Sequence, residues 1–98
     1  MTAWHLEALR KIRAEILAIA ARRGARRLRV FGSVARGDGG PTSDVDFLVE
    51  FEPGRSLLDF GGLVADLEEL LDCKVDVVSE PALRPRFRER VTKEAIPL

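Results

Sequence analysis

The sequence predicts an α/β protein of the α+β kind, in which helices cover a small mixed β-sheet. Two kinds of segment favour this class. Some have apolar residues three and four positions apart, as in amphipathic helices, and others are short and rich in Val and Phe, as strands are. The two kinds alternate along 98 residues, a length that suits one core, so we expect a single domain covering residues 1–98.

The first segment, residues 4–23, is predicted to form one amphipathic helix. Gly24 follows directly, and a glycine commonly ends a helix. Trp4 and His5 lie at its start, where packing or contact with a partner is a better explanation than catalysis. The apolar stripe consists of Leu6, Leu9, Ile12, Ile16, Ile19 and Ala20.

A short strand, residues 28–31, is predicted to lead into a phosphate-binding turn. Gly32 lets backbone N–H groups approach an anion closely, and the Ser33 hydroxyl can cap a helix that begins there. A phosphate would then meet free N–H groups, a helix N-terminus and the Ser33 oxygen together. Arg36 adds a forked positive charge that can bind phosphates or pin the loop, and both roles stay open. Gly32, Ser33 and Arg36 are therefore candidate nucleotide-binding residues, and Asp38 is expected to serve the turn.

The next segment places two carboxylates together. Residues 37–43 are dense in turn formers, and residues 44–51 alternate as a strand does. Asp44 and Asp46 then share one face of the strand and lie side by side. Carboxylates this close repel each other unless a cation lies between them, so the pair predicts a magnesium site beside the phosphate-binding turn. The opposite, apolar face consists of Val45, Phe47, Val49 and Phe51.

A second helix is predicted from Ser56, as its N-cap, to about Asp72. Gly61 and Gly62 interrupt it with residues of low helix propensity, which suggests close packing at that point. Nothing on this helix indicates chemistry. Its expected buried side consists of Leu57, Phe60, Leu63, Val64, Leu67, Leu70 and Leu71.

Residues 74–79 are predicted to form a third strand. Val75 and Val77 would face one way and Asp76 the other. An acidic residue inside a Val-rich strand is costly unless it is paired, ligated or wet. If this strand lies beside the central one, Asp76 joins Asp44 and Asp46 on one face; the alternative is a surface aspartate on an edge strand.

The tail, residues 83–98, is predicted to form a short closing helix. Its apolar residues fall four apart, and its arginines are expected to be largely solvated, with a partner-binding or nucleotide-binding role for one of them left open. The apolar set is Leu83, Phe87, Val91 and Ala95, and the basic set is Arg84, Arg86, Arg88 and Arg90.

Composition excludes several classes of protein. Sixteen basic and sixteen acidic residues balance, so no global field would recruit nucleic acid or an anionic membrane, and we expect direct binding to neither. No apolar run approaches the length of a membrane span, which favours a cytoplasmic protein. Cys73 is the single cysteine and His5 the single histidine, so neither an internal disulfide nor a Cys/His zinc set is possible.

Charge is nevertheless segregated along the chain. Residues 1–38 carry nine basic and three acidic side chains, residues 39–82 two and eleven, and residues 83–98 five and two. A basic flank beside an acidic centre suits a metal–triphosphate ligand or pairing with another chain, and solvated helix faces are the plainer explanation for most individual charges.

Together, Gly32-Ser33, Ala35-Arg36-Gly37 and Ser43-Asp44-Val45-Asp46 resemble the signature of the DNA polymerase beta-type nucleotidyltransferase superfamily. The similarity is greatest to its minimal nucleotidyltransferase (MNT) group. The resemblance implies that Asp44, Asp46 and Asp76 are the catalytic, metal-binding carboxylates, with ATP as substrate and Mg²⁺, as two ions, as cofactor. It also implies a partner, because MNT domains are often antitoxins that transfer AMP to a tyrosine of a HEPN ribonuclease toxin.

The expected reaction is therefore nucleotidyl transfer from ATP to a hydroxyl acceptor, as in a type VII-like antitoxin. Asp76 is a further candidate for general base. Two alternatives stay open: a non-catalytic module that masks a partner, and a small-molecule nucleotidyltransferase of the aminoglycoside type, whose acceptor pocket so small a domain would have to complete as a homo-oligomer.

Overall fold

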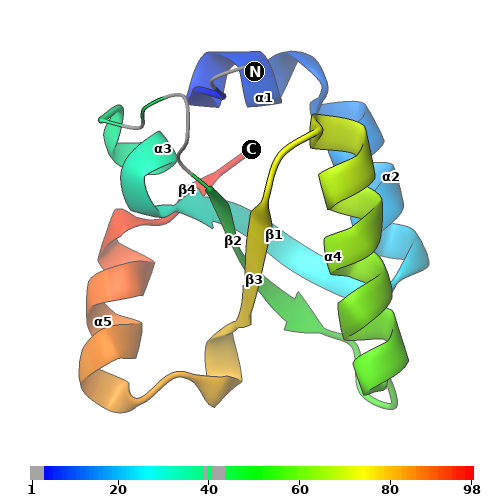
Figure 1. Cartoon of the computed structure of the whole chain (residues 1–98). Helices are drawn as coiled ribbons and strands as arrows, with labels where there is room; N and C mark the ends of the chain where they lie inside the picture. Colours follow the sequence, from blue (N-terminus) through cyan, green and yellow to red (C-terminus); the bar gives the residue numbers. More distant parts are fainter. Residues whose placement is uncertain (1–3, 39, 41–43) are drawn as a thin grey trace.

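The structure, a computed structural model, describes residues 4–38, 40 and 44–98. Four strands form one sheet in the order β3-β2-β1-β4 (Figure 1). β1 (Ala25–Phe31) pairs antiparallel with β2 (Val45–Phe51) and with β4 (Ile96–Pro97), whereas β2 pairs parallel with β3 (Val75–Ser79). This confirms the predicted fold class, a mixed sheet with helices around it. The helices are α1 (Leu6–Lys11), α2 (Arg13–Arg22), α3 (Gly32–Arg36), α4 (Leu57–Leu71), the 3₁₀ turn η1 (Glu80–Ala82) and α5 (Pro85–Glu94).

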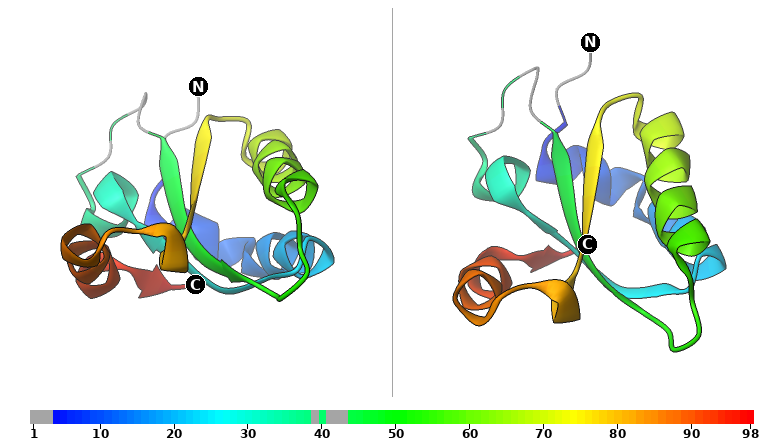
Figure 2. Two further views of the ribbon diagram at one scale, coloured as in Figure 1. Left: turned by 90° about the horizontal axis from the view of Figure 1, so that it is seen from below. Right: turned by 60° about the horizontal axis from the view of Figure 1, so that its bottom comes forward.

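The two faces of the sheet carry different helices. α2 and α4 lie together on one side and α5 lies on the other (Figures 1 and 2). Alternate residues of β2, among them Val45, Phe47 and Val49, are fully buried in the core under α2 and α4. The strand period therefore sends Asp46 and Leu48 to the opposite face, as predicted for Asp46.

The single helix predicted over residues 4–23 is wrong in one respect, because the chain turns at Ile12. The Ile12 N–H donates to the carbonyl of Leu9, three residues back, at 3.1 Å, and α2 starts afresh after it. The turn lets α1 cross one end of the sheet while α2 runs along its face (Figure 1). Leu9 of α1 and Ile16, Ile19 and Ala20 of α2 are buried. They belong to the predicted apolar stripe, so helical spacing alone does not distinguish two short helices from one straight helix.

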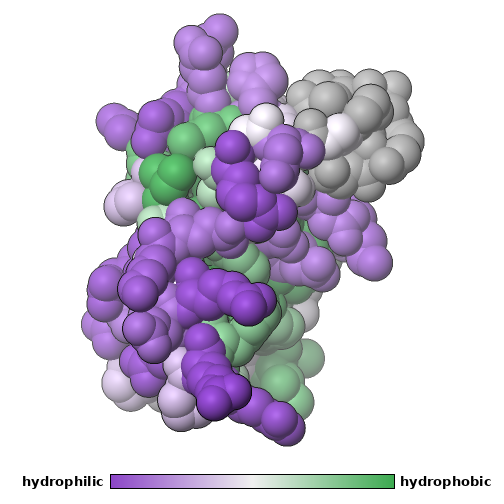
Figure 3. All heavy atoms as spheres, turned by 90° about the vertical axis from the view of Figure 1, so that its left-hand side faces the viewer, coloured by the Kyte–Doolittle hydropathy of each residue, from purple (hydrophilic) through white to green (hydrophobic). Residues whose placement is uncertain are grey.

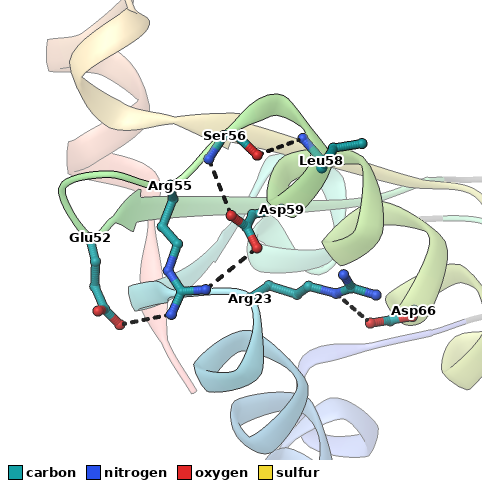
Figure 4. A network of polar contacts seen from close by, with 7 residues as sticks. All are labelled: Arg23, Glu52, Arg55, Ser56, Leu58, Asp59 and Asp66. Atoms are coloured by element: carbon teal, nitrogen blue, oxygen red, sulfur yellow. Dashed lines mark hydrogen bonds and ion pairs between the residues drawn. The ribbon is translucent and has the colours of Figure 1, made fainter.

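The second predicted helix is confirmed as α4, with a complete capping box. The Leu58 N–H donates to Ser56 Oγ at 3.2 Å, and the Ser56 N–H donates to Asp59 Oδ2 at 3.2 Å (Figure 4). Arg55 also contacts Asp59, which ties the loop to the first turn. The prediction of a buried Leu57 is wrong: its exposure is 87%, because it occupies the first position of α4, beyond the cover of the sheet.

The tail forms a shorter helix than predicted and then a strand. α5 begins at Pro85, and Ala95 is already extended, so the expected helix over residues 83–98 is wrong at both ends. Val30 pairs with Ile96, which makes β4 an edge strand that no sequence pattern indicated. Of the apolar set expected on this helix, Val91 is buried, whereas Phe87 is 47% exposed.

Arginines dominate the outer surface of α5. Figure 3 shows that the face on this side of the molecule is largely hydrophilic. The predicted solvation of the basic set is confirmed, since Arg84, Arg86, Arg88 and Arg90 are all exposed. Within the part of the chain that the structure describes, no helix has both the length and the apolar character needed to cross a membrane.

The capping box yields a stability prediction. Ser56→Ala removes the acceptor for the first-turn N–H of α4 and should lower the free energy of unfolding by about 1 kcal/mol. Thr92→Ala is the matched control, because the Thr92 hydroxyl donates only to carbonyls within α5. We expect its effect to stay within about 0.5 kcal/mol. Urea denaturation of both variants measures the difference, and equal losses would contradict a capping role for Ser56.

Candidate functional site

The centre of the candidate site is a pair of aspartates on neighbouring parallel strands. Asp46 of β2 and Asp76 of β3 are partners in the register of the two strands. In-register residues of parallel strands project from the same face, so the two carboxylates are neighbours. Asp46 is half-buried and Asp76 is exposed. The structure therefore brings together two residues that lie 30 positions apart in the sequence.

The carboxylates of Asp44 and Asp76 are close enough to Asp46 to change its pKa. The pKa of Asp46 is raised to about 6, chiefly by burial and then by the charge of Asp76, a hydrogen bond with Asp76 and the charge of Asp44. The positive charge of Arg36 opposes this effect. Two ionised carboxylates this close repel each other, and this repulsion is part of what raises the pKa of Asp46.

Asp44, the third predicted carboxylate, immediately precedes β2 and is half-buried. Its negative charge helps to raise the pKa of Asp46. The pKa of the Cys73 thiol is raised chiefly by burial and next by the charge of Asp44. Among residues 4–38, 40 and 44–98, no three acidic, His or Cys side chains converge tightly enough to enclose a metal ion. The donors nevertheless fit Mg²⁺, which prefers carboxylate oxygens, and a cation would relieve the repulsion that raises the pKa of Asp46.

The predicted phosphate-binding turn lies directly against this pair. Phe31, the last residue of β1, is the register partner of Asp46, and α3 begins at the next residue. Gly32 has φ +75°, and a Cβ at this position would collide with Asp46 Oδ2. Only glycine therefore allows this approach of the turn to the aspartate. The expected cap by Ser33 is wrong, because Ser33 lies within α3 and the N-cap Phe31 provides no side-chain bond.

Arg36 and Gly32 share a partner that the sequence analysis missed. Glu94, the last residue of α5, accepts a hydrogen bond from the Gly32 N–H at 2.9 Å and another from Arg36 Nη1 at 2.6 Å. Arg36 Nε also donates to Asp38 at 3.2 Å, so Asp38 serves the turn as expected. Glu94 lies 58 residues from Arg36 and 62 from Gly32, and no local pattern could have indicated these contacts.

A family model described as "Nucleotidyltransferase domain" matches residues 9–98. The chain belongs to this family. A Methanocaldococcus jannaschii protein named "Putative protein adenylyltransferase MJ0435" is 40% identical over 88 residues, which is 90% of this chain and 95% of the relative. "Protein adenylyltransferase MntA" of Thermococcus cleftensis is 43% identical over 73 residues, 74% of each chain.

Solved structures agree with this assignment. A "Structure of putative minimal nucleotidyltransferase" superposes with a TM-score of 0.89 at 54% identity and covers 100% of both chains. A "Crystal structure of the toxin-antitoxin with AMP-PNP" superposes with a TM-score of 0.74 over 86% of this chain and 69% of that one; its 20% identity shows a common fold. The prediction of a nucleotidyltransferase enzyme is thus confirmed.

The perturbed Asp46 yields a prediction about pH. A carboxyl group whose pKa is raised in the folded state contributes stability below its unfolded pKa, and that contribution is lost as the pH rises to about 6. Asp46→Asn should therefore be more stable than the parent at pH 7 in the absence of divalent cations, by roughly 1 kcal/mol since solvent screens a half-buried group. The gain should vanish near pH 4.

Chemical denaturation of both proteins from pH 4 to pH 7 in EDTA measures this difference. Comparing the two proteins at each pH cancels the contributions of the carboxylates that do not interact with Asp46. A stability difference that does not change with pH would contradict the repulsion inferred at Asp46.

The close approach of Gly32 to Asp46 yields a second prediction. Gly32→Ala and Gly37→Ala both place an L side chain at a positive φ, +75° and +82° respectively. Each should lose about 1 kcal/mol through backbone strain. Among the residues that the structure describes, nothing lies within 4 Å of the Cβ position at Gly37, whereas Asp46 occupies the one at Gly32. Gly32→Ala should therefore lose at least about 1 kcal/mol more in urea denaturation. Equal losses would mean that Asp46 moves aside at no cost.

Proposed function

We propose that this chain is a Mg²⁺-dependent protein adenylyltransferase that transfers AMP from ATP to a hydroxyl group, on a tyrosine of a HEPN-type toxin. The observation that carries the proposal is the register of β2 and β3, which sets Asp46 beside Asp76 and next to the turn that begins at Gly32. Carboxylates for a divalent cation and a turn for phosphates then lie on one face of the sheet. Such an arrangement suits a metal-bound nucleoside triphosphate.

Each residue has a defined task in the proposed mechanism. Asp44, Asp46 and Asp76 would hold Mg²⁺, as two ions, and the α3 turn with Ser33 would orient the outer phosphates of ATP. Bound Mg²⁺ supplies positive charge for the phosphate oxygens and lowers the pKa of the acceptor hydroxyl. The acceptor oxygen attacks the α-phosphorus in line. The bond between the α-phosphorus and the oxygen that bridges it to the β-phosphorus breaks, and pyrophosphate leaves. Asp76, the exposed member of the pair, would take the hydroxyl proton.

The choice of a protein acceptor rests on the relatives. Two proteins at 40% and 43% identity are named protein adenylyltransferases, and the first is matched over 95% of its length. The toxin–antitoxin structure supports a toxin as the partner through its fold. Because ATP is the donor and Cys73 is a free thiol, we also propose the cytoplasm as the place of action.

A labelling experiment tests the proposal. The purified protein is incubated with a lysate of its source cells, Mg²⁺, and ATP labelled at the α- or the γ-phosphate. We expect label from the α position alone to reach one protein band, whose modified tyrosine mass spectrometry identifies. Asp46→Ala should reduce transfer by at least about 100-fold if the carboxylates bind the metal.

Asp66→Asn is the matched control, because Asp66 of α4 pairs with Arg23 at the end of α2 (Figure 4) and belongs to neither the aspartate pair nor the α3 turn. Its transfer rate should stay within about twofold of the parent. Label on a small molecule would favour the aminoglycoside type of acceptor instead. Capture of a partner by both the parent and Asp46→Ala without any transfer would favour a non-catalytic antitoxin.

A further inference from the structure

We propose that Glu94 is a positioning residue, which holds the phosphate-binding turn against the catalytic aspartates without touching the nucleotide. The inference rests on the proposed nucleotidyl transfer and assigns a role in it to the C-terminal helix. Its basis is one carboxylate that contacts both ends of α3. One oxygen accepts from the first backbone N–H of the helix, at Gly32, and the other accepts from Arg36, the last residue.

Such a contact matters because, apart from the buried Val34, α3 has little of its own to hold it in place. The helix has five residues, too few to be stable alone, and its N-cap contributes no side-chain hydrogen bond. Gly37 follows in the left-handed region, where glycine ends the helix. Glu94 therefore supplies the anion that a helix N-terminus favours and the partner for its C-terminal cation.

Glu94 itself is carried by regular structure. The Ala95 N–H donates to the carbonyl of Val91 at 2.9 Å, and Val91 is buried. Two residues after Glu94, Ile96 pairs with Val30 of β1, the strand that leads into α3. The C-terminal end of α5 lies beside α3 in Figures 1 and 2. The carboxylate is thus held by a helix and a strand, which is the support that a well-placed binding turn needs.

The same contacts define what remains for a phosphate. The Gly32 N–H is already used, and Arg36 is shared between two carboxylates, Glu94 and Asp38. The hydrogen bonds to Glu94 and Asp38 raise the pKa of Arg36, and the bond from Arg36 lowers the pKa of Glu94. Of the two roles open to Arg36, the contacts favour pinning the loop. Phosphate then meets Ser33, while Gly32 and Arg36 act through the shape of the turn.

Binding of Mg²⁺ and an ATP analogue with a methylene bridge between its α- and β-phosphates, the position at which transfer breaks ATP, tests the inference separately from transfer. Glu94→Leu keeps the size of the side chain and removes both acceptors. We expect at least tenfold weaker binding by calorimetry, a displaced Gly32 amide resonance in the ¹H–¹⁵N spectrum, and a raised KM for ATP in transfer. Glu94→Gln keeps an acceptor for Gly32 and should lose no more than about threefold.

Glu89→Gln is the control on the same helix, because the Glu89 side chain pairs at the surface with Lys93 of α5 itself. It should bind as the parent does. Glu94→Asp serves if the leucine variant does not fold: it keeps the charge but is one methylene too short to reach both partners. A positioning role predicts at least threefold weaker binding for Glu94→Asp, and a purely electrostatic role predicts none.

The outcomes separate this inference from the proposed function. Parent-like binding by Glu94→Leu, with transfer intact, would overturn the positioning role alone. Tighter binding would also overturn it, because Glu94 would then compete with phosphate for the Gly32 N–H. If the parent binds nucleotide but transfers nothing, the proposed reaction fails and the binding series still decides the role of Glu94. A parent that binds no nucleotide would overturn both.

Discussion

The parallel pairing of β2 with β3 is the constraint on which the rest of the site depends. It sets Asp46 against Asp76 on one face while Val45 and Val75, their neighbours in the register, enter the core. Folding gains apolar burial on one side of these strands and meets carboxylate repulsion on the other. Burial of Asp46 first, and then the charges of Asp76 and Asp44, raise the pKa of Asp46. A cation is the natural way to resolve the repulsion, so the stability of the sheet and the chemistry of the site are linked.

The turn at Gly32 can lie against Asp46 because glycine has no side chain to collide with that carboxylate. Because Asp46 occupies the position of a Cβ, backbone can approach the carboxylates only at a glycine. A turn that close to acidic groups also needs its own charges balanced. Arg36 meets Glu94 and Asp38, which keeps its positive charge near the site without leaving it free. The C-terminal helix thus takes part in the architecture of the site, although the motif ends far earlier in the chain.

Several features of the site could be predicted because their signals are local. Asp44 and Asp46 are two apart, which predicts that they share one face of a strand. Asp46 lies in β2, and Asp44 immediately precedes that strand. The Ser56 cap and the end of α2 before Gly24 also follow from short-range rules, and both are found. Asp76 needed one assumption, that its strand lies next to β2, and the observed register supports it. The turn at Ile12 and the exposure of Leu57 were missed. Helical spacing shows which residues share one face of a helix, but it does not show where the sheet that covers this face ends.

The sequence by itself determined the class of fold, the kinds of element and the chemical identity of the candidate site. These depend on periodicity, on turn residues and on the oxygen ligands that a motif supplies, and all of them act over a few residues. Only the tertiary structure decided that β4 pairs with β1 at Val30 as an edge strand and that Glu94 accepts hydrogen bonds from Gly32 and Arg36. Those contacts join residues about 60 positions apart. Long-range partners are selected by the packing of whole elements, which no short window of sequence contains.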